Sequence, residues 1–167
     1  MDFTPTDEMI GIKVPYIEDA RADFAPYYSV AGHGKTESQI QIEIITELAK
    51  LGGGSIQFRR GYFGEEPHKR YGYIINFSLG GQPARMVIAG LPIKTESSKK
   101  IVAVCVQALC IVRDWLKNAV TAQVFAPGSN PLVQYLLVDG DRTLVEALIE
   151  DRHIPDTNPP LLTGGKS

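Results

Sequence analysis

The feature that most constrains the fold is a nearly uninterrupted apolar run at residues 101–116. Only three polar residues interrupt this run: Gln107, Arg113 and Asp114. A helix that is apolar on every side is buried on every side, in a core or against a partner. The run is too short, and too closely flanked by charge, for a membrane span of roughly 20 apolar residues. We therefore predict a buried helix over residues 94–118, beginning at a Thr95 N-cap. The side chains expected to be largely buried are Val102, Val106, Leu109 and Val112.

Length and composition predict an ordinary globular chain: 167 residues, 44% hydrophobic and 22% charged. A net charge of −2 argues against broad attraction to nucleic acid or a membrane, although it permits a local basic patch. Cys105 and Cys110 lie five residues apart on one helix, so we expect them to be unbridged, reduced thiols. The acidic, polar start of the chain has no signal-peptide pattern. We therefore expect a cytoplasmic protein with no membrane partner.

A second helix is predicted at residues 36–51. Thr36 and Gln39 form a capping-box pattern at its start, and the glycines at 52–54 follow its end. One apolar stripe runs along it: Ile40, Ile44, Leu48 and Leu51. Residues 39–44 also alternate like a strand, but the cap and the glycine stop favour a helix.

Three strands are expected in succession, at residues 55–63, 70–79 and 84–93. Gly80-Gly81 is a hairpin signal, and the short turns indicate an antiparallel meander. The middle strand carries one apolar row that helices must cover: Tyr71, Tyr73, Ile75, Phe77 and Leu79. Together these patterns predict an α+β fold with an αβββα core.

The remaining chain is predicted to form extensions of this core. Asn130-Pro131 favours a short helix over residues 132–138, with an edge strand as the alternative. A turn at 138–141 leads to a last helix, which Thr143 and Glu146 cap and which ends near Arg152. These elements form a helical C-terminal extension of the αβββα core. Three regions are expected: an N-terminal arm at 1–35 with a strand near 11–16, a single α+β domain at 36–152, and a disordered tail at 153–167.

The order of elements and two short motifs resemble the double-stranded RNA-binding domain. Glu66-Pro67-His68-Lys69 lies where that family has a histidine-containing loop between its first two strands. Ser98-Lys99-Lys100 with Ala103 lies where the family opens its second helix with a lysine pattern. The resemblance covers about residues 36–116. It implies that His68, Lys69, Lys99 and Lys100 contact ribose hydroxyls and phosphates across successive grooves.

Basic and aromatic residues alternate in the segment 58–73, which is the pattern that single-stranded nucleic acid binding needs. Arg59 and Arg60 are adjacent on a strand, so they point to opposite faces. Arg60 shares parity with Ile56 and Phe58, so Arg59 is the better candidate for an open face. The expected contact residues are Arg59, Arg60, Tyr62, His68, Lys69, Arg70, Lys99 and Lys100. The alternative is an amphipathic sheet with ordinary charged turns.

Catalysis has little support in the sequence. The three histidines are scattered, and no His/Cys pair has the spacing of metal ligands. The strand region 55–93 offers only Glu65 and Glu66 as carboxylates. The Gly34-Lys35-Thr36 triplet lacks the earlier glycine of a phosphate loop, because Ser29 stands there. No enzyme activity, cofactor or metal is expected.

Two functions follow from these patterns. The first is a non-catalytic accessory protein that binds nucleic acid, single-stranded DNA or RNA in preference to duplex. The alternative is an oligomerising structural or assembly protein, a homo-oligomer in which the apolar helix 101–116 lies at a subunit interface.

Overall fold

The computed structural model describes residues 14–20, 35–66, 69–128 and 130–151. The α+β prediction is confirmed: a helix, three antiparallel strands and a helix follow one another, with a smaller C-terminal region after them. Neither His68 nor the tail at 153–167 lies within the described residues. The elements in chain order are η1 (Ile17–Asp19), α2 (Glu37–Lys50), β1 (Gly53–Phe63), β2 (Arg70–Leu79), β3 (Gln82–Ala89), α3 (Ser98–Phe125), η3 (Pro131–Tyr135), β4 (Leu137–Asp139), β5 (Arg142–Thr143) and α4 (Leu144–Glu150).

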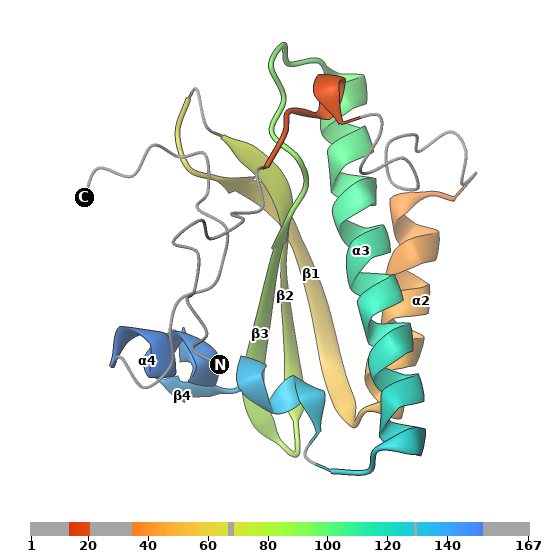
Figure 1. Cartoon of the computed structure of the whole chain (residues 1–167), viewed down its shortest axis with the longest axis vertical. Helices are drawn as coiled ribbons and strands as arrows, with labels where there is room; N and C mark the ends of the chain where they lie inside the picture. The colour runs from red at the N-terminus through yellow and green to blue at the C-terminus, as the bar shows by residue number, and fades with distance from the viewer. Residues whose placement is uncertain (1–13, 21–34, 67–68, 129, 152–167) are drawn as a thin grey trace, which may run out of the picture.

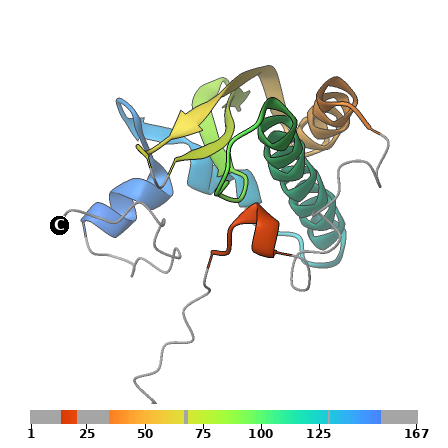
Figure 2. The same cartoon turned by 90° about the horizontal axis from the view of Figure 1, so that it is seen from above.

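The three main strands form one sheet in the order β1-β2-β3. Helices α2 and α3 lie side by side over one face of this sheet, α2 against β1 and α3 against β2 and β3 (Figure 1). Seen from above, both helices are on the same side of the strands, and α4 lies away from them (Figure 2). The sheet therefore has one face covered by helices and a second face that the helices leave open.

The core forms between this helical layer and the sheet. As predicted, Tyr73, Ile75 and Phe77 are buried on the helix-covered face. Val106, Leu109 and Val112 of α3 are also buried, as expected, but Val102 is 41% exposed. The prediction for Val102 is wrong because the helical layer is a surface layer, so one side of α3 faces solvent near its start.

Local capping signals decide where α2 begins. The Thr36 hydroxyl accepts from the Gln39 N–H, and the Gln39 side chain accepts from the Thr36 N–H, so the predicted capping box is confirmed. Helix α3, by contrast, begins after Ser97 and not after Thr95. The backbone N–H groups of Lys94 and Thr95 donate to the Glu18 carboxylate, which holds this stretch outside the helix. The helix also continues to Phe125, past the predicted end at 118, with Val120 packed against the core.

The strands differ from the prediction at their ends. Strand β1 begins at Gly53, with an irregular register between Gly54 and Gln57. The predicted Gly80-Gly81 turn is confirmed, and both glycines have positive φ, at 58° and 76°. Strand β3 ends at Ala89 and does not reach residue 93, because Leu91 and Ile93 turn into a second buried cluster.

That second cluster binds the described N-terminal residues to the core. Val14 and Ile17 pack with Leu91, Ile93 and Val104. The Ile17 N–H donates to the carbonyl oxygen of Pro92 at 2.9 Å. Residues 14–16 do not form the predicted strand, and the part of it at 11–13 lies outside the described residues.

Both elements predicted as alternatives for the segment 132–138 are present in it. Its first part belongs to the short helix η3, and its last two residues belong to strand β4. Asn130 caps η3 by accepting from the Leu132 N–H at 2.9 Å, and β4 begins two residues after η3 ends. Leu136 forms an isolated antiparallel bridge with Ala84 of β3. The predicted capping box of Thr143 and Glu146 at the start of α4 is confirmed, and the helix ends at Glu150.

Candidate functional site

The two adjacent arginines of β1 have different surroundings. Arg60 reaches the first turn of α2, where its Nη1 lies 3.2 Å from Oε1 of Glu37. Its neighbour Arg59 therefore points to the face of the sheet that the helices leave open. Arg59 is exposed, and no residue in the described part of the chain forms an ion pair with it.

Tyr62 and Lys69 belong to a small cluster at the end of the β1–β2 hairpin. The Lys69 Nζ lies 4.2 Å from the centre of the Tyr62 ring and 4.9 Å from that of Tyr71. It also lies 3.7 Å from Oε1 of Glu96, which accepts a hydrogen bond from the Tyr71 hydroxyl. The Tyr71 hydroxyl raises the pKa of Lys69, desolvation acts to lower it, and the Glu96 charge adds to the rise. The charge of Lys69 thus has partners within the chain.

Arg70 and Lys100 serve the structure of the loop between β3 and α3. The Arg70 guanidinium donates to the carbonyl oxygens of Gly90 at 2.8 Å and Ala89 at 3.2 Å. Burial lowers the pKa of Arg70. The Lys100 ammonium donates to Glu18 at 3.1 Å and to the Thr95 carbonyl at 3.0 Å.

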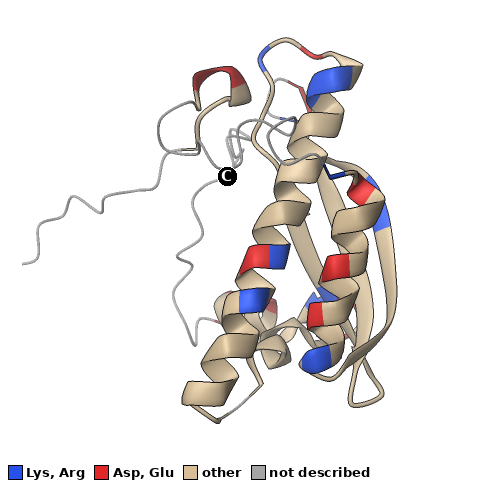
Figure 3. Cartoon of the chain, turned by 90° about the vertical axis from the view of Figure 1, so that its right-hand side faces the viewer, with Lys and Arg blue, Asp and Glu red and all other residues tan. Residues whose placement is uncertain are grey.

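The predicted contact residues consequently do not converge on one basic surface. Among the seven that the structure describes, only Arg59 and Lys99 have no charged or carbonyl partner in the described part of the chain. These two belong to different layers, Lys99 to the helical layer and Arg59 to the open face of the sheet. On the helical side, acidic and basic residues are interspersed along α2 and α3 (Figure 3). Arg113, for example, pairs with Glu43 of α2 at 3.2 Å.

A groove that the sequence did not predict lies between β3 and α3. Its volume is about 190 Å³. Trp115 and Tyr135 meet edge to face in its wall, with ring centres 5.9 Å apart. Val87 on its rim is 47% exposed, which is high for a valine in a strand. The lining is apolar and aromatic: Met86, Val87, Ile88, Ile111, Val112, Trp115 and Tyr135.

The groove lies beside the outer edge of β3. Strand β3 pairs with β2 along its whole length, but on its other side the described residues pair with it only at Ala84. The Gly90 N–H donates inward to the Tyr71 carbonyl, so by antiparallel alternation the N–H groups of Val87 and Ala89 point outward. Arg85, just before them, is held by the Asp141 carbonyl. The part of this edge that the described residues leave open therefore runs over residues 86–89.

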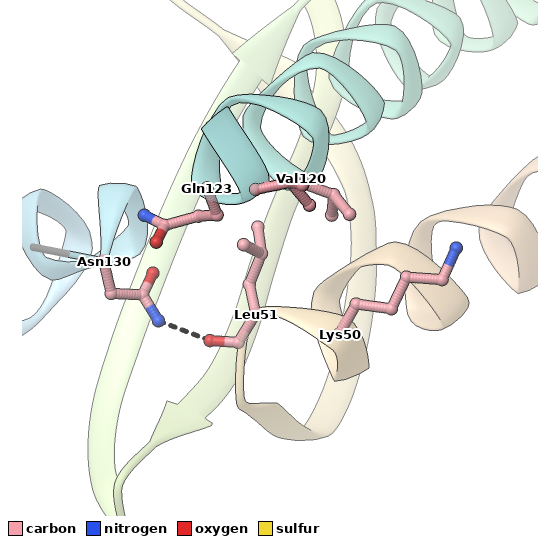
Figure 4. A pocket seen from close by; sticks show the side chains of 6 residues that line it. Lys50, Leu51, Val120, Gln123 and Asn130 are labelled. Atoms are coloured by element: carbon pink, nitrogen blue, oxygen red, sulfur yellow. Dashed lines mark hydrogen bonds between the residues drawn. The ribbon is translucent and has the colours of Figure 1, made fainter. Parts of the chain in front are cut away.

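A second pocket, of about 290 Å³, lies where α2 ends and α3 finishes (Figure 4). The Asn130 side chain donates to the Leu51 carbonyl across this pocket, while its oxygen accepts from the Leu132 N–H. Both ends of this amide are therefore used to join η3 to α2. Lys50, Val120, Gln123 and Val124 complete the wall.

Other kinds of site find no support in the described residues. No group of three His, Cys, Asp or Glu side chains there could hold a metal ion. Cys105 and Cys110 are buried free thiols, as predicted, and burial raises the pKa of both, which disfavours the reactive thiolate. None of the described helices combines the length and apolar character needed to cross a bilayer.

Comparison with protein-family models, curated proteins and solved structures finds no match to this chain. The αβββα order that resembles the double-stranded RNA-binding domain is present, and β4, β5 and α4 extend it. The site must therefore be interpreted from its own geometry.

Proposed function

We propose that this protein is a non-catalytic protein-interaction module. Its binding site is the groove between β3 and α3, and its ligand is an extended apolar segment of a partner protein. The segment would add to the edge of β3 as a further strand, which is the mode called β-augmentation. This proposal develops the expectation of an assembly protein. From the apolar helix 101–116, the residues that would contribute to the binding surface are Ile111, Val112 and Trp115.

The observation that carries the proposal is the position of the open edge directly beside the apolar groove. Outward N–H groups of Val87 and Ala89 supply a backbone ladder, which gives affinity for any extended chain. The groove supplies the specificity, because alternate side chains of an added strand would enter it. Most of the other apolar side chains of α3 are buried in the core, as Val106 and Leu109 illustrate.

A peptide titration tests this proposal. The probe is an acetylated, amidated hexapeptide of alternating threonine and valine, and the control peptide has the same side chains on an N-methylated backbone. Trp115 is the only tryptophan of the chain and lines the groove, so its emission reports binding there. We expect saturable binding of the probe and none of the control peptide. Equal binding of both peptides would contradict the strand-addition mode.

Two variants of one residue locate the binding. Val87→Pro removes an outward N–H while leaving the inward ladder to β2 intact, because proline is tolerated on edge strands. Val87→Thr keeps that N–H and the β-branched shape, so it is the matched control. We expect Val87→Pro to weaken the probe about tenfold, roughly the loss of one or two net hydrogen bonds. Unchanged binding in Val87→Pro would contradict the proposal.

A second candidate function, binding of single-stranded nucleic acid, is supported by Arg59 and Tyr62. Arg59 is exposed without a charged partner in the described chain, and the Tyr62 ring is 63% exposed beside Lys69. Binding of labelled single-stranded and duplex oligonucleotides at low and physiological salt tests it. We expect Arg59→Ala to weaken binding and to reduce the salt slope by about one. Unchanged affinity in a folded Arg59→Ala protein, with Arg60→Ala as the comparison, would reject this function.

A further inference from the structure

The groove between β3 and α3 ends where the C-terminal region meets the start of β3. Leu136 bridges Ala84 there, and Tyr135 forms part of the groove wall. A strand added along residues 86–89 cannot continue past Arg85, because the chain around Leu136 already lies against that part of the edge. Its end must therefore leave the sheet over β4, β5 and α4, and Figure 1 shows β4 and α4 beside β3.

This C-terminal region is acidic. Residues 137–151 contain five carboxylates and one arginine, which gives a net charge of −4 in a chain whose total is −2. The carboxylates belong to Asp139, Asp141, Glu146, Glu150 and Asp151. Arg142 already lies 2.5 Å from Asp139 and 2.7 Å from Glu150, and no described residue forms an ion pair with Asp141. The surface that the end of an added strand reaches is therefore negative.

Arg85 does not cancel this negative charge. Its guanidinium lies 3.6 Å from Glu146 and donates to the Asp141 carbonyl oxygen. At the other end of the edge, around the loop between β3 and α3, the described charges pair with one another. These pairs are Lys69 with Glu96 at 3.7 Å, Lys94 with Asp19 at 2.6 Å and Lys100 with Glu18 at 3.1 Å. The groove thus has an acidic end at Arg85 and a paired end at the loop.

We propose that the partner segment is an apolar strand followed by basic residues, and that it adds to β3 in the antiparallel direction. This inference rests on the proposed function, because it assigns the chemistry of the segment that enters the same groove. Antiparallel pairs are slightly more stable per residue than parallel pairs, and in this direction the C-terminal end of the segment lies at Arg85. Lysine or arginine side chains at that end would meet the acidic region 137–151. Complementary charge of this kind selects the partner and raises the association rate.

A set of peptides tests this charge requirement through the emission of Trp115. The neutral probe is the threonine–valine hexapeptide, and two further peptides add three lysines or three glutamates after it. We expect the lysine peptide to bind about fivefold more tightly than the neutral probe at low salt, and the glutamate peptide to bind more weakly. The difference should shrink at physiological salt, because exposed charges are screened there. A fourth peptide, with the three lysines placed before the hexapeptide, should bind no more tightly than the neutral probe.

Two double variants of the protein locate the charges. Asp139→Asn with Asp141→Asn removes two charges from the acidic region and keeps side chains that suit the turn at Gly140. It should reduce the advantage of the lysine peptide to about twofold or less and leave the affinity of the neutral probe unchanged. Glu65→Gln with Glu66→Gln is the matched control, because it removes the same charge from exposed positions in the turn between β1 and β2. It should leave the advantage of the lysine peptide unchanged.

The possible failures of the inference and of the proposed function are distinguishable. Equal affinities of the lysine and glutamate peptides would overturn the inference, while saturable binding of the neutral probe would still support the proposed function. Tighter binding of the peptide with leading lysines than of the one with trailing lysines would overturn the antiparallel direction. Absence of any Trp115 response to all four peptides would count against the proposed function itself.

Discussion

Glu18 is the residue that fixes where the N-terminal segment meets the core. Its carboxylate accepts from the backbone N–H of Lys94 at 3.1 Å and of Thr95 at 3.3 Å, and from the Lys100 ammonium at 3.1 Å. Glu18→Gln keeps the shape of the side chain but removes the charge. We expect this substitution to loosen residues 14–20 from the loop between β3 and α3.

The pKa of Glu18 gives the size of the effect. Partial burial acts to raise this pKa, but the hydrogen bonds from Lys94, Lys100 and Thr95 outweigh burial and lower it from 4.5 to about 2. Thermodynamic linkage converts that fall in pKa into an upper bound of about 3 kcal/mol on the contribution of the Glu18 carboxylate to the free energy of unfolding. Because the side chain remains about a quarter exposed, we expect roughly 1–2 kcal/mol in practice.

The sign of the pH dependence follows from the direction of the shift. A carboxylate with a lowered pKa in the folded state stabilises that state above its ordinary pKa of 4.5. This contribution is lost as the pH falls from 4.5 toward about 2. The difference in unfolding free energy between the parent protein and Glu18→Gln should therefore shrink across this window.

Urea denaturation of both proteins between pH 7 and pH 2 measures this difference. Asp19→Asn is the control, because the only ion pair of Asp19 with another described residue is the exposed one with Lys94, at 2.6 Å. We expect it to cost less than about 0.5 kcal/mol. A Glu18→Gln difference below about 0.5 kcal/mol at pH 7, or one that does not change with pH, would refute the assigned role of Glu18.

Two further predictions concern packing. Val106→Asp should destabilise the protein by about 4 kcal/mol or more, because it buries an unpaired charge, whereas Val102→Asp on the exposed side of α3 should cost less than about 1 kcal/mol. Similar melting temperatures for these two variants would contradict the orientation of α3. Gly90→Ala should cost about 2–3 kcal/mol, since a Cβ there would lie 2.3 Å from the Val104 carbonyl oxygen. An added Cβ at Gly61 meets no atom within 4 Å, so Gly61→Ala should change the free energy of unfolding by less than about 1 kcal/mol, as measured by thermal unfolding. Equal losses of stability in Gly90→Ala and Gly61→Ala would reject the close approach of Gly90 to α3.

Features encoded by neighbouring residues could be predicted from the sequence. The capping boxes at Thr36 and Thr143 each depend on a residue three positions further on, so the sequence shows both partners. The burial of Tyr73 and Ile75 follows from the period of two along β2. These signals were sufficient for the αβββα order.

Features that depend on distant residues could not be predicted. The start of α3 depends on Glu18, which is 76 positions away from Lys94 and removes Lys94 and Thr95 from the helix. The sequence pattern predicted a nucleic-acid surface because the ion-pair partners of the basic residues, such as Glu37 for Arg60, lie on other elements and are not evident from the sequence. The groove combines side chains from β3, α3 and η3, and only the packing of α3 on the sheet brings Trp115 next to Tyr135.

The most direct test of the proposed binding site is the set of nuclear Overhauser effects between the threonine–valine peptide and the protein. We predict contacts from the peptide backbone to the amides of Val87 and Ala89, and from alternate peptide side chains to the Trp115 ring. Contacts confined to the pocket near Leu51, or to the open face around Arg59, would contradict it.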